Sequence, residues 1–512
     1  MTSDKKVRVR FAPSPTGPLH MGGVRTALYN YLFAKHHGGD FILRIEDTDR
    51  ERFVPGAEAY IIESLKWCGI EPNEGLGFGD GPHTPYRQSE RKEKGLYRGY
   101  AEKLVADGFA YYAFDTREEL EEMRKKLEAA KVASASYNSV TRQNMKNSLT
   151  LSEDEVKTRL ERGDAYVIRI KIPRNEEIRV NDLIRGWVLV NSAQMDDKVL
   201  YKSDGMPTYH LANVVDDYNM KITHVIRGEE WLPSAPLHVL LYRYLGWEEA
   251  MPQFAHLPLL LRPDGNGKLS KRDGDRLGFP VFPIDWKPEG GEGASGYREA
   301  GYFPEAFINM LALLGWHPSG NQEIFTMAEL IEQFSLERVS KSGAKFDPEK
   351  AKWFNQHYLR HKPAQEILSL WKPELEQKGL SLPDASLLKI CGLLTEKASF
   401  IGEFTELGSY FFKAPEGYDE GVIKKRWNEN AKEFAALILE KYRSAKSFDA
   451  ATAENLFKES CSEAGIKPGE VMQLFRVVLT GLPGGPALFE VAEILGNDVC
   501  VERIELFLSK NA

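Results

Sequence analysis

A histidine followed by two glycines lies where an extended segment gives way to a helical one. Residues 7–11 alternate apolar and basic side chains, as a half-buried strand does, and the prolines that follow end the pattern. His20, Gly22 and Gly23 then precede a helical pattern over residues 24–35. Unpaired N–H groups and the dipole at a helix start suit a triphosphate, glycines admit a nucleotide close to the backbone, and a histidine can donate to phosphate oxygens. A tight structural turn with a surface histidine explains the same residues.

A second segment, Lys268-Leu269-Ser270-Lys271-Arg272, ends a glycine-rich loop with three cations. Such a loop could close over a phosphate and neutralise the charge that peaks in the transition state of phosphoryl transfer. It is not a Walker loop, because no glycine-flanked Gly-Lys-Ser/Thr precedes a helix here. The alternative is a basic surface loop without catalytic function.

The elements around these segments predict a doubly wound sheet. A strand over residues 41–43 follows the first helix and leads into the polar stretch 44–49, which completes a βαβ unit whose ligands bind at the carboxyl ends of the strands. A charged, helical stretch over 90–163 and strand-like segments at 166–172 and 187–190 follow. At 209–215 and 223–226 apolar, β-branched character returns, as if the sheet resumes after an insertion. Beyond residue 347 the pattern is helical, and the glycine-rich 288–296 indicates a surface loop or flexible insertion.

The composition excludes several classes of protein. Its 512 residues suggest about three or four domains, and 42% apolar with 28% charged residues excludes wholesale disorder. We find no apolar run of membrane-spanning length, no secretory signal, and four widely spaced cysteines, which together predict a cytoplasmic protein. The net charge of −8 excludes a globally basic nucleic-acid coat. Residues 338–362 nevertheless hold seven Lys/Arg and two acids, which indicates either a solvated helical face or a surface that contacts RNA.

The chain resembles the class I aminoacyl-tRNA synthetases, in their bacterial glutamyl branch. Residues 11–23 are similar to the HIGH signature region of that family, and Lys268–Arg272 to its KMSKS signature. The resemblance continues at 43–50, 202–217, 225–231, 254–258 and 302–316, and more loosely at 479–481 and 485–496. It covers about residues 7–360 with high specificity.

The resemblance implies a multidomain α/β plus all-α fold. It would place a Rossmann catalytic domain at 1–89 and 209–252, split by an acceptor-end-binding insertion at 90–208. A connecting, stem-contact domain with the KMSKS-like loop would occupy 253–346, and a helical anticodon-binding region 347–512.

Family roles carry over onto matching residues. The resemblance implies catalytic roles for His20, Lys268 and Lys271, and ATP binding by these three with Gly22, Gly23, Glu230 and Ser270. The glutamate site would comprise Arg10, Ser14, Glu46, Tyr209, Asn213 and Arg227. The chemistry agrees, because glutamate has two carboxylates and an ammonium and needs guanidinium groups with one acid. We expect Arg10 to meet the side-chain carboxylate and Arg227 the α-carboxylate, although the sequence alone does not order the two.

The implied reaction is that of a glutamate–tRNA ligase. L-Glutamate would react with ATP, accompanied by Mg²⁺, to give glutamyl-adenylate and pyrophosphate. The glutamyl group would then pass to the 3′-terminal adenosine of tRNA(Glu), for which the family uses the 2′-hydroxyl, and AMP would leave. We expect a monomer without a membrane partner.

Three departures from the family pattern stand out. Gly23 replaces the last histidine of the first signature, as is common in the glutamyl branch. Many relatives carry a zinc knuckle in the insertion, but those positions here read Ala113-Phe114-Asp115 and Thr141-Arg142-Gln143, so we expect no zinc site. Residues 275–296 form a longer link than usual beside the KMSKS-like loop, and its role stays open.

Several alternatives remain at this point. Within the class, the chain could be a glutaminyl enzyme or a non-discriminating glutamyl one. A tRNA-base-modifying glutamyl transferase lacks the helical half, and a small-metabolite nucleotidyltransferase is much shorter. Asp47-Thr48-Asp49 could indicate a metal-dependent glycosyltransferase, but that motif leaves Lys268–Arg272 unexplained. A catalytically inactive RNA-binding scaffold would have no need of Lys271.

Overall fold

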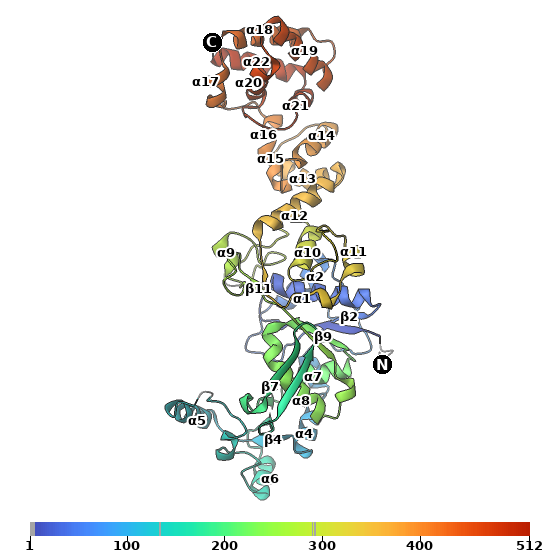
Figure 1. The fold of residues 1–512 in the computed structure, drawn as a ribbon, viewed down its shortest axis with the longest axis vertical. Coiled ribbons are helices and arrows are strands. Elements are labelled where there is room, and N and C mark those ends of the chain that lie inside the picture. The colour runs from blue at the N-terminus through green and yellow to red at the C-terminus, as the bar shows by residue number, and fades with distance from the viewer. Residues whose placement is uncertain (1–5, 133–134, 289, 291–292, 512) are drawn as a thin grey trace. The chain divides into compact units, whose positions relative to one another are not determined.

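The computed structural model describes residues 6–132, 135–288, 290 and 293–511. Two compact units make up the chain (Figure 1). The first comprises Met1–Ala300 and Pro304–Pro348, and the second Gly301–Phe303 and Glu349–Ala512. The boundary after Pro348 lies beside the predicted start of the helical region at 347, whereas the finer division of the first unit stays a prediction.

The first βαβ unit is as predicted. Strand β1 (Arg8–Phe11) pairs in parallel with β2 (Asp40–Leu43), from Arg8 opposite Asp40 to Phe11 opposite Leu43, and helix α1 (Met21–His36) connects them. Strand β3 (Glu74–Gly75) adds in parallel to β2. The carboxyl ends of β1 and β2 therefore lie together, beside the start of α1.

A second sheet continues the first. Its strand order is β7-β6-β10-β9, with β9 (His224–Gly228) parallel to β10 (Gln253–Leu257) and the hairpin of β6 (Glu177–Asp182) and β7 (Gly186–Asn191) at the far edge. The backbone N–H of Thr223, just before β9, donates to the Arg8 carbonyl oxygen at 2.9 Å. Strand β9 therefore flanks β1, and both end at the same edge.

One prediction about the sheet is wrong. Residues 209–215 do not form a strand but begin helix α7 (Tyr209–Asn219), in which residues 211–217 are all buried. The apolar residues Leu211, Val214, Val215 and Tyr218 do recur at the spacing of one helical face, but the adjacent β-branched Val214 and Val215 were read as a sign of a strand. Residues 223–226 do enter a strand, β9.

The inserted stretch combines helices with a small antiparallel sheet. Strands β4 (Ala110–Ala113), β5 (Val167–Ile170) and β8 (Val199–Tyr201) form this sheet in that order. Helices α5 (Arg117–Ala129) and α6 (Glu153–Arg162) bury no side chain. Both begin with a side-chain cap, Thr116 and Ser152 respectively, which satisfies an N–H of the first turn. The other elements of the first unit are α2 (Ala57–Trp67), α3 (Gln88–Glu93), α4 (Arg98–Ala106), α8 (Ala235–Tyr244), β11 (Leu260–Leu261), α9 (Asp273–Leu277), α10 (Pro304–Leu313), α11 (Met327–Gln333) and β12 (Ala344–Lys345).

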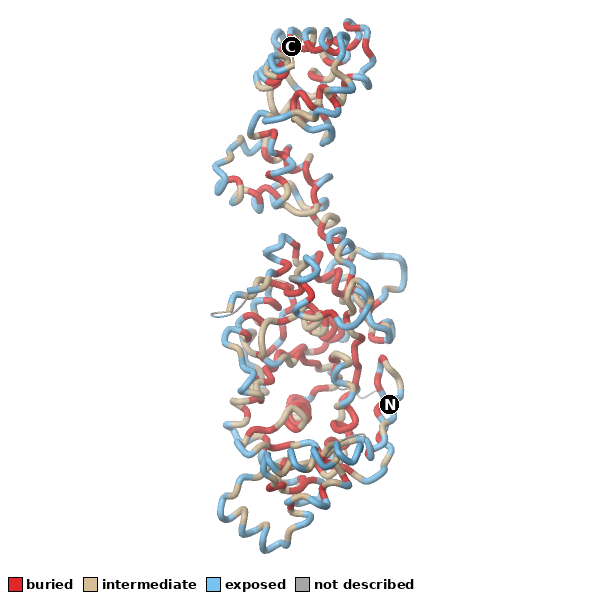
Figure 2. Tube along the Cα trace, turned by 90° about the vertical axis from the view of Figure 1, so that its left-hand side faces the viewer, coloured by how far each residue is buried: buried red, intermediate tan, exposed pale blue. Residues whose placement is uncertain are grey.

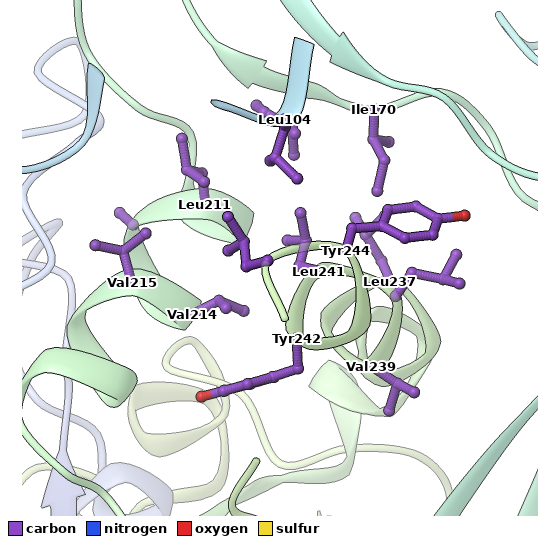
Figure 3. Packing of buried hydrophobic residues seen from close by; sticks show 14 of the residues in the cluster. Leu104, Ile170, Leu211, Val214, Val215, Leu237, Val239, Leu241, Tyr242 and Tyr244 are labelled. Atoms are coloured by element: carbon purple, nitrogen blue, oxygen red, sulfur yellow. The ribbon is translucent and has the colours of Figure 1, made fainter. Parts of the chain in front are cut away.

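A hydrophobic core joins the insertion to the second sheet. It packs Leu104 of α4 and Ile170 of β5 against Leu211 of α7 and Leu241 of α8 (Figure 3). Helix α8 lies almost wholly inside, since nine of its ten residues are buried. Because α7 packs here, its polar residues Tyr209 and Asn213 are held at a fixed place near the ends of β1 and β9.

The regular secondary structure of the second unit is helical over its described residues, as predicted. Buried and exposed positions alternate along its helices (Figure 2), and those between residues 422 and 507 pack around a shared core. No helix among the described residues has the length and apolar character that a bilayer crossing requires. The helices are α12 (Pro348–His361), α13 (Ala364–Gln377), α14 (Asp384–Thr395), α15 (Phe404–Leu407), α16 (Ser409–Phe412), α17 (Glu420–Arg426), α18 (Glu429–Ser444), α19 (Ala450–Glu463), α20 (Pro468–Thr480), α21 (Leu488–Leu495) and α22 (Asn497–Lys510).

The link over 275–296 is tied to the rest of the first unit at its described positions. Trp286 and Ala294 exchange two backbone hydrogen bonds of 2.9 and 3.0 Å, and the Trp286 ring packs edge-on against Tyr60, 5.2 Å between centroids. Ala294 is therefore hydrogen-bonded within the link, and the interpretation of 288–296 as a surface loop or a flexible insertion stays a prediction. Residues 289, 291 and 292, on which it also rested, lie outside the described residues.

Candidate active site

A cleft of about 370 Å³ opens at the shared carboxyl edge of the strands, within the first unit. Its walls come from the ends of β1 and β9, the start of α1 and the start of α7. Most predicted site residues line it, although segments far apart in the sequence supply them. These are Arg10, Ser14, Gly22, Gly23, Glu46, Tyr209, Asn213, Arg227 and Glu230. His20, Lys268, Ser270 and Lys271 are not part of the cleft wall itself.

His20 caps helix α1 and keeps one nitrogen available. Its Nδ1 accepts from the Gly22 N–H at 3.1 Å, so the neutral ring carries its proton on Nε2. That Nε2 atom is buried and has no hydrogen-bond partner among the described residues, although the Ser270 backbone lies near it. Burial, reinforced by the charges of Lys271 and Lys268, lowers the pKa of His20 to about 4. At neutral pH the side chain is therefore an uncharged donor.

The start of α1 differs from the prediction in one respect. We expected unpaired N–H groups there, but the Met21 N–H donates to Val281 and the Gly23 N–H to the His20 carbonyl, at 2.9 and 2.7 Å. The Gly22 N–H is taken by the His20 ring. The helix dipole remains, but the free donor at this end is His20 Nε2.

The two glycines have different functions. A Cβ at Gly23 would come within 2.5 Å of Leu19 Cδ1, so this glycine permits tight packing under the loop. A Cβ at Gly22 would have only ordinary contacts, 3.4 Å to His20 Nδ1 and 3.7 Å to Leu260. The protein's own packing therefore does not require a glycine at Gly22, which lines the cleft and is the better candidate for close approach of a nucleotide.

The lysine-rich loop lies against the first signature. Its Leu269 N–H donates to the Leu260 carbonyl at 2.8 Å, which ties the loop to β11. The Lys271 amine reaches Gly17, where a Cβ would be 3.3 Å from Nζ. Lys268 forms an exposed ion pair with Glu230, Nζ to Oε1 3.1 Å. Because exposed pairs contribute little energy, a phosphate can replace Glu230 as the partner of Lys268.

Ser270 is engaged within the loop. Its hydroxyl and backbone N–H both donate to Asp273 Oδ2 at 2.7 Å. These bonds, together with Arg262, hold the pKa of Asp273 far below its usual range. The hydroxyl therefore fixes the shape of the loop, and its predicted contact with ATP stays a prediction.

Glu46 presents one carboxylate oxygen to the cleft. Its Oε1 accepts from Arg44 NH2 and from Asn213 Nδ2, both at 2.9 Å, whereas Oε2 has no hydrogen bond to a described residue. Burial raises its pKa against the opposing effect of Arg44 and Arg10. Asn213 therefore orients Glu46, and the free oxygen can accept from an ammonium group.

Arg10 is already neutralised. Its Nε and NH2 donate to the two oxygens of Asp217 at 3.0 and 3.2 Å, and Arg44 NH1 donates to Asp217 at 2.8 Å. The three side chains are almost fully buried. The two guanidinium groups hold the pKa of Asp217 below its usual range, although burial acts in the opposite direction.

Arg227 has no carboxylate partner among the described residues. Its NH1 donates to the Tyr209 hydroxyl at 2.7 Å, and its Nε to His256 Nε2 at 3.0 Å. The Tyr209 ring packs on Trp231, 4.3 Å between centroids, and burial raises its pKa to about 12. Because the Tyr209 oxygen accepts from Arg227, its own proton is available to a ligand in the cleft.

Sequence reasoning missed the partners that orient these residues. Asp217 and His256 lie inside segments that carry the family resemblance, so a signal was present. Arg44 lies in such a segment too, 43–50, and was otherwise read as part of a polar strand exit, whereas Asp182 was not singled out. Each of these four residues acts on the site by orienting another side chain, and its residue type alone does not reveal that role.

The zinc-knuckle positions hold an ordinary hydrogen-bonded turn. Asp115 accepts from the Lys146 N–H at 2.7 Å and from the Tyr137 hydroxyl at 3.0 Å. Among the described residues, no three His, Cys, Asp or Glu side chains are grouped as a metal site would require. Asp115 thereby joins the two stretches that a zinc ion would otherwise connect.

Zinc removal provides a test of that interpretation. We expect protein treated with a zinc chelator to keep full activity and an unchanged melting temperature, because Asp115, Thr141 and Gln143 offer no thiolate or imidazole. Metal analysis with activity before and after chelation measures both. One tightly bound zinc per chain whose loss abolishes activity would contradict the expectation.

Comparison with known proteins places these features in a family. The model of the catalytic domain of class I tRNA synthetases (E and Q) matches residues 6–353, and that of an anticodon binding domain matches 361–508. The chain is 58% identical to a glutamate–tRNA ligase of Cytophaga hutchinsonii over 99% of the chain and 98% of that protein. It is 56% identical to one of Parabacteroides distasonis over 98% of each. The crystal structure of a glutamate tRNA ligase from Elizabethkingia meningosepticum in complex with its amino acid is 50% identical, with a TM-score of 0.94 and 99% of both chains covered.

Proposed function

The chain belongs to the class I tRNA synthetases of the glutamate and glutamine group, and from that premise we propose which residues perform each step. The activity is that of a glutamate–tRNA ligase. The glutamate α-carboxylate attacks the α-phosphate of ATP in line and expels pyrophosphate, and a ribose hydroxyl of the terminal adenosine of tRNA then attacks the adenylate and releases AMP. No side chain acts as a nucleophile, so positioning and charge neutralisation supply the acceleration.

The observation that carries the choice of amino acid is the way in which the buried arginines around the cleft are paired. Three of them, Arg10, Arg44 and Arg91, form ion pairs with Glu46, Asp216 and Asp217. Arg227 instead donates to Tyr209 and His256, and the buried carboxylate of Asp182 reaches it only through the His256 ring. Because no carboxylate of the described residues bonds to Arg227 directly, its donors suit the side-chain carboxylate that glutamate has and glutamine lacks.

The same pairing supports the reverse of our expectation from the sequence, in which Arg10 met the side-chain carboxylate and Arg227 the α-carboxylate. Arg10 shares Asp217 with Arg44, whereas Arg227 bonds to no carboxylate among the described residues. A guanidinium group without a directly bonded carboxylate gains most from a full negative charge. We therefore assign the side-chain carboxylate to Arg227 and the Tyr209 hydroxyl. The free oxygen of Glu46 would bind the ammonium group, with Arg10 and Ser14 completing the site.

The ATP end of the cleft would use the uncharged donor and the lysines. His20 Nε2 donates to a phosphate oxygen, Gly22 admits the nucleotide, and Lys271 and Lys268 neutralise the charge that develops as pyrophosphate leaves. Magnesium would arrive on the triphosphate, held by phosphate oxygens and water, since the described residues include no cluster of three possible ligands.

The helical unit would bind the tRNA anticodon. Two aromatic residues of the basic stretch 338–362 are candidates for contact with RNA bases: Trp353 on α12 is 42% exposed, whereas Tyr358 is half-buried and has a partner. An exposed aromatic ring beside basic residues suits unstacked bases. The monomeric state and cytoplasmic location belong to the same proposal and can be measured by light scattering and cell fractionation.

Trp353→Ala tests this part of the proposal. Loss of one base–aromatic stack costs about 1–3 kcal/mol, so we expect KM for tRNA(Glu) to rise by about tenfold or more. KM for glutamate should not change. Trp353→Phe, which keeps an aromatic ring at the same position, is the matched control and should leave KM for tRNA nearly unchanged. An unaltered KM for tRNA in Trp353→Ala would remove this residue from the RNA surface.

ATP–pyrophosphate exchange tests the activation step. We expect exchange with glutamate and little with glutamine, measured with and without tRNA(Glu). Exchange that prefers glutamine would favour the alternative, a glutaminyl enzyme. Charging of the glutamine tRNA with glutamate would identify a non-discriminating one.

A further inference from the structure

The guanidinium group of Arg227 is held by imidazole rather than by carboxylate. Its Nε donates to His256 Nε2 at 3.0 Å, and its NH1 lies 3.5 Å from His238 Nδ1. Both histidines are buried, with 0% and 1% of their surface exposed. Burial lowers the pKa of each, so both rings are neutral at physiological pH.

Asp182 decides which nitrogen of His256 carries the proton. Its Oδ2 lies 2.6 Å from His256 Nδ1, and a carboxylate only accepts, so Nδ1 carries the hydrogen and Nε2 keeps its lone pair for Arg227. Asp182 also accepts from the backbone N–H groups of His256, Ile184 and Arg185, at 3.1, 3.0 and 2.8 Å. These bonds hold the pKa of Asp182 below its usual range against the effect of burial.

We propose that Asp182 and His256 form a positioning relay that fixes Arg227 through a neutral acceptor, so that its guanidinium group can meet the substrate's side-chain carboxylate without a directly bonded carboxylate of the protein. The inference rests on the proposed role of Arg227. A carboxylate in the place of His256 would hold the guanidinium equally well but would neutralise it, as Asp217 does for Arg10. Imidazole supplies the hydrogen bond without the negative charge.

The relay also assigns a function to the inserted stretch. Asp182 is the last residue of β6, opposite Phe254 of β10, and therefore belongs to the predicted insertion at 90–208. The hairpin turn after it carries Arg185, whose side chain pairs with Glu229, two residues beyond Arg227. The insertion thus supplies a positioning residue for amino-acid selection in the catalytic cleft.

Two substitutions of His256 separate the two ends of the relay. Asparagine reaches the place of Nδ1, so His256→Asn keeps a donor for Asp182 and loses the acceptor for Arg227. Glutamine reaches the place of Nε2, so His256→Gln can still accept from Arg227. His224→Gln is the control, because His224 lies on the neighbouring strand β9 and bonds to Thr223 instead.

The measurement is aminoacylation of tRNA(Glu), with KM determined for glutamate and for ATP. We expect His256→Asn to raise KM for glutamate by about tenfold or more, the cost of one hydrogen bond to a charged group, and to narrow the preference over glutamine. KM for ATP should stay unchanged. His256→Gln should recover most of the loss, and His224→Gln should match the wild type.

The outcomes are distinguishable. A wild-type protein that fails to charge glutamate would overturn the proposed function itself. If the wild type charges glutamate but the KM for glutamate of His256→Asn is unchanged, the relay alone is overturned. An equal rise in KM for ATP in His256→Asn would also overturn the relay.

If His256→Asn does not fold, Asp182→Asn tests the relay instead, because an amide facing His256 Nδ1 forces the proton onto Nε2, where it opposes the Arg227 donor. A selective rise in its KM for glutamate supports the relay, and an unchanged KM overturns it.

Discussion

Lys271→Ala should lower the rate of glutamate activation by about two to three orders of magnitude. The Lys271 amine lies beside Gly17, in the loop that leads to His20, where the leaving pyrophosphate develops its charge. Charge that is needed chiefly in the transition state affects kcat more than substrate binding. ATP–pyrophosphate exchange at saturating glutamate measures the effect.

The control for this variant is Arg272→Ala. Arg272 is the next residue of the same loop, is exposed, and makes no side-chain cap to α9. The Arg272→Ala variant should lose far less exchange activity than Lys271→Ala. Both variants should keep the wild-type affinity for tRNA and the wild-type melting temperature. Near-normal exchange by Lys271→Ala would remove the lysine from the catalytic step.

Arg227→Gln should narrow the preference for glutamate over glutamine by about a hundredfold. A lost hydrogen bond to a charged group costs about 1.5–3 kcal/mol, and polar sites reject analogues that leave their groups unpaired. In the wild type, the glutamine amide would set its own donors against the Arg227 donors. The variant removes that conflict as well as the attraction for glutamate.

Arg10→Gln is the matched comparison, since Arg10 lines the same cleft but is neutralised by Asp217. It should reduce kcat/KM for both amino acids to a similar extent, and Arg44 still compensates Asp217. The measurement is kcat/KM for glutamate and glutamine, with tRNA present, in the wild type and both variants. If Arg10→Gln narrows the preference and Arg227→Gln does not, the order expected from the sequence is the right one.

The parts of the fold that could be predicted from the sequence are those with a pattern confined to neighbouring residues. The unit of β1, α1 and β2 follows from alternation, a proline-rich stop and a helical period, each confined to a few residues. Helix α7 was misread because two adjacent valines, Val214 and Val215, favoured a strand over the helical spacing of its apolar residues. The free N–H groups expected at α1 are absent because Val281, more than 250 positions along the chain, and the His20 side chain occupy them.

For the candidate site, too, one part could be predicted from the sequence and another part could not. The family resemblance implied Arg10, Glu46 and Arg227, and the structure brings all three to one cleft. The resemblance could not show that Asp217 neutralises Arg10 whereas a neutral imidazole holds Arg227. That contrast depends on tertiary pairing between distant residues, and it reverses the assignment of the two arginines.

The most direct test of the account is the transfer of labelled glutamate to purified tRNA(Glu) by the wild-type protein. Labelled glutamine is run in parallel, with ATP present or omitted. We predict ATP-dependent attachment of glutamate to the 3′ end, with kcat/KM at least about a hundredfold above that for glutamine, because Arg227 meets no carboxylate of the protein among the described residues. Attachment of glutamine in preference to glutamate, or no attachment of either, would contradict the account.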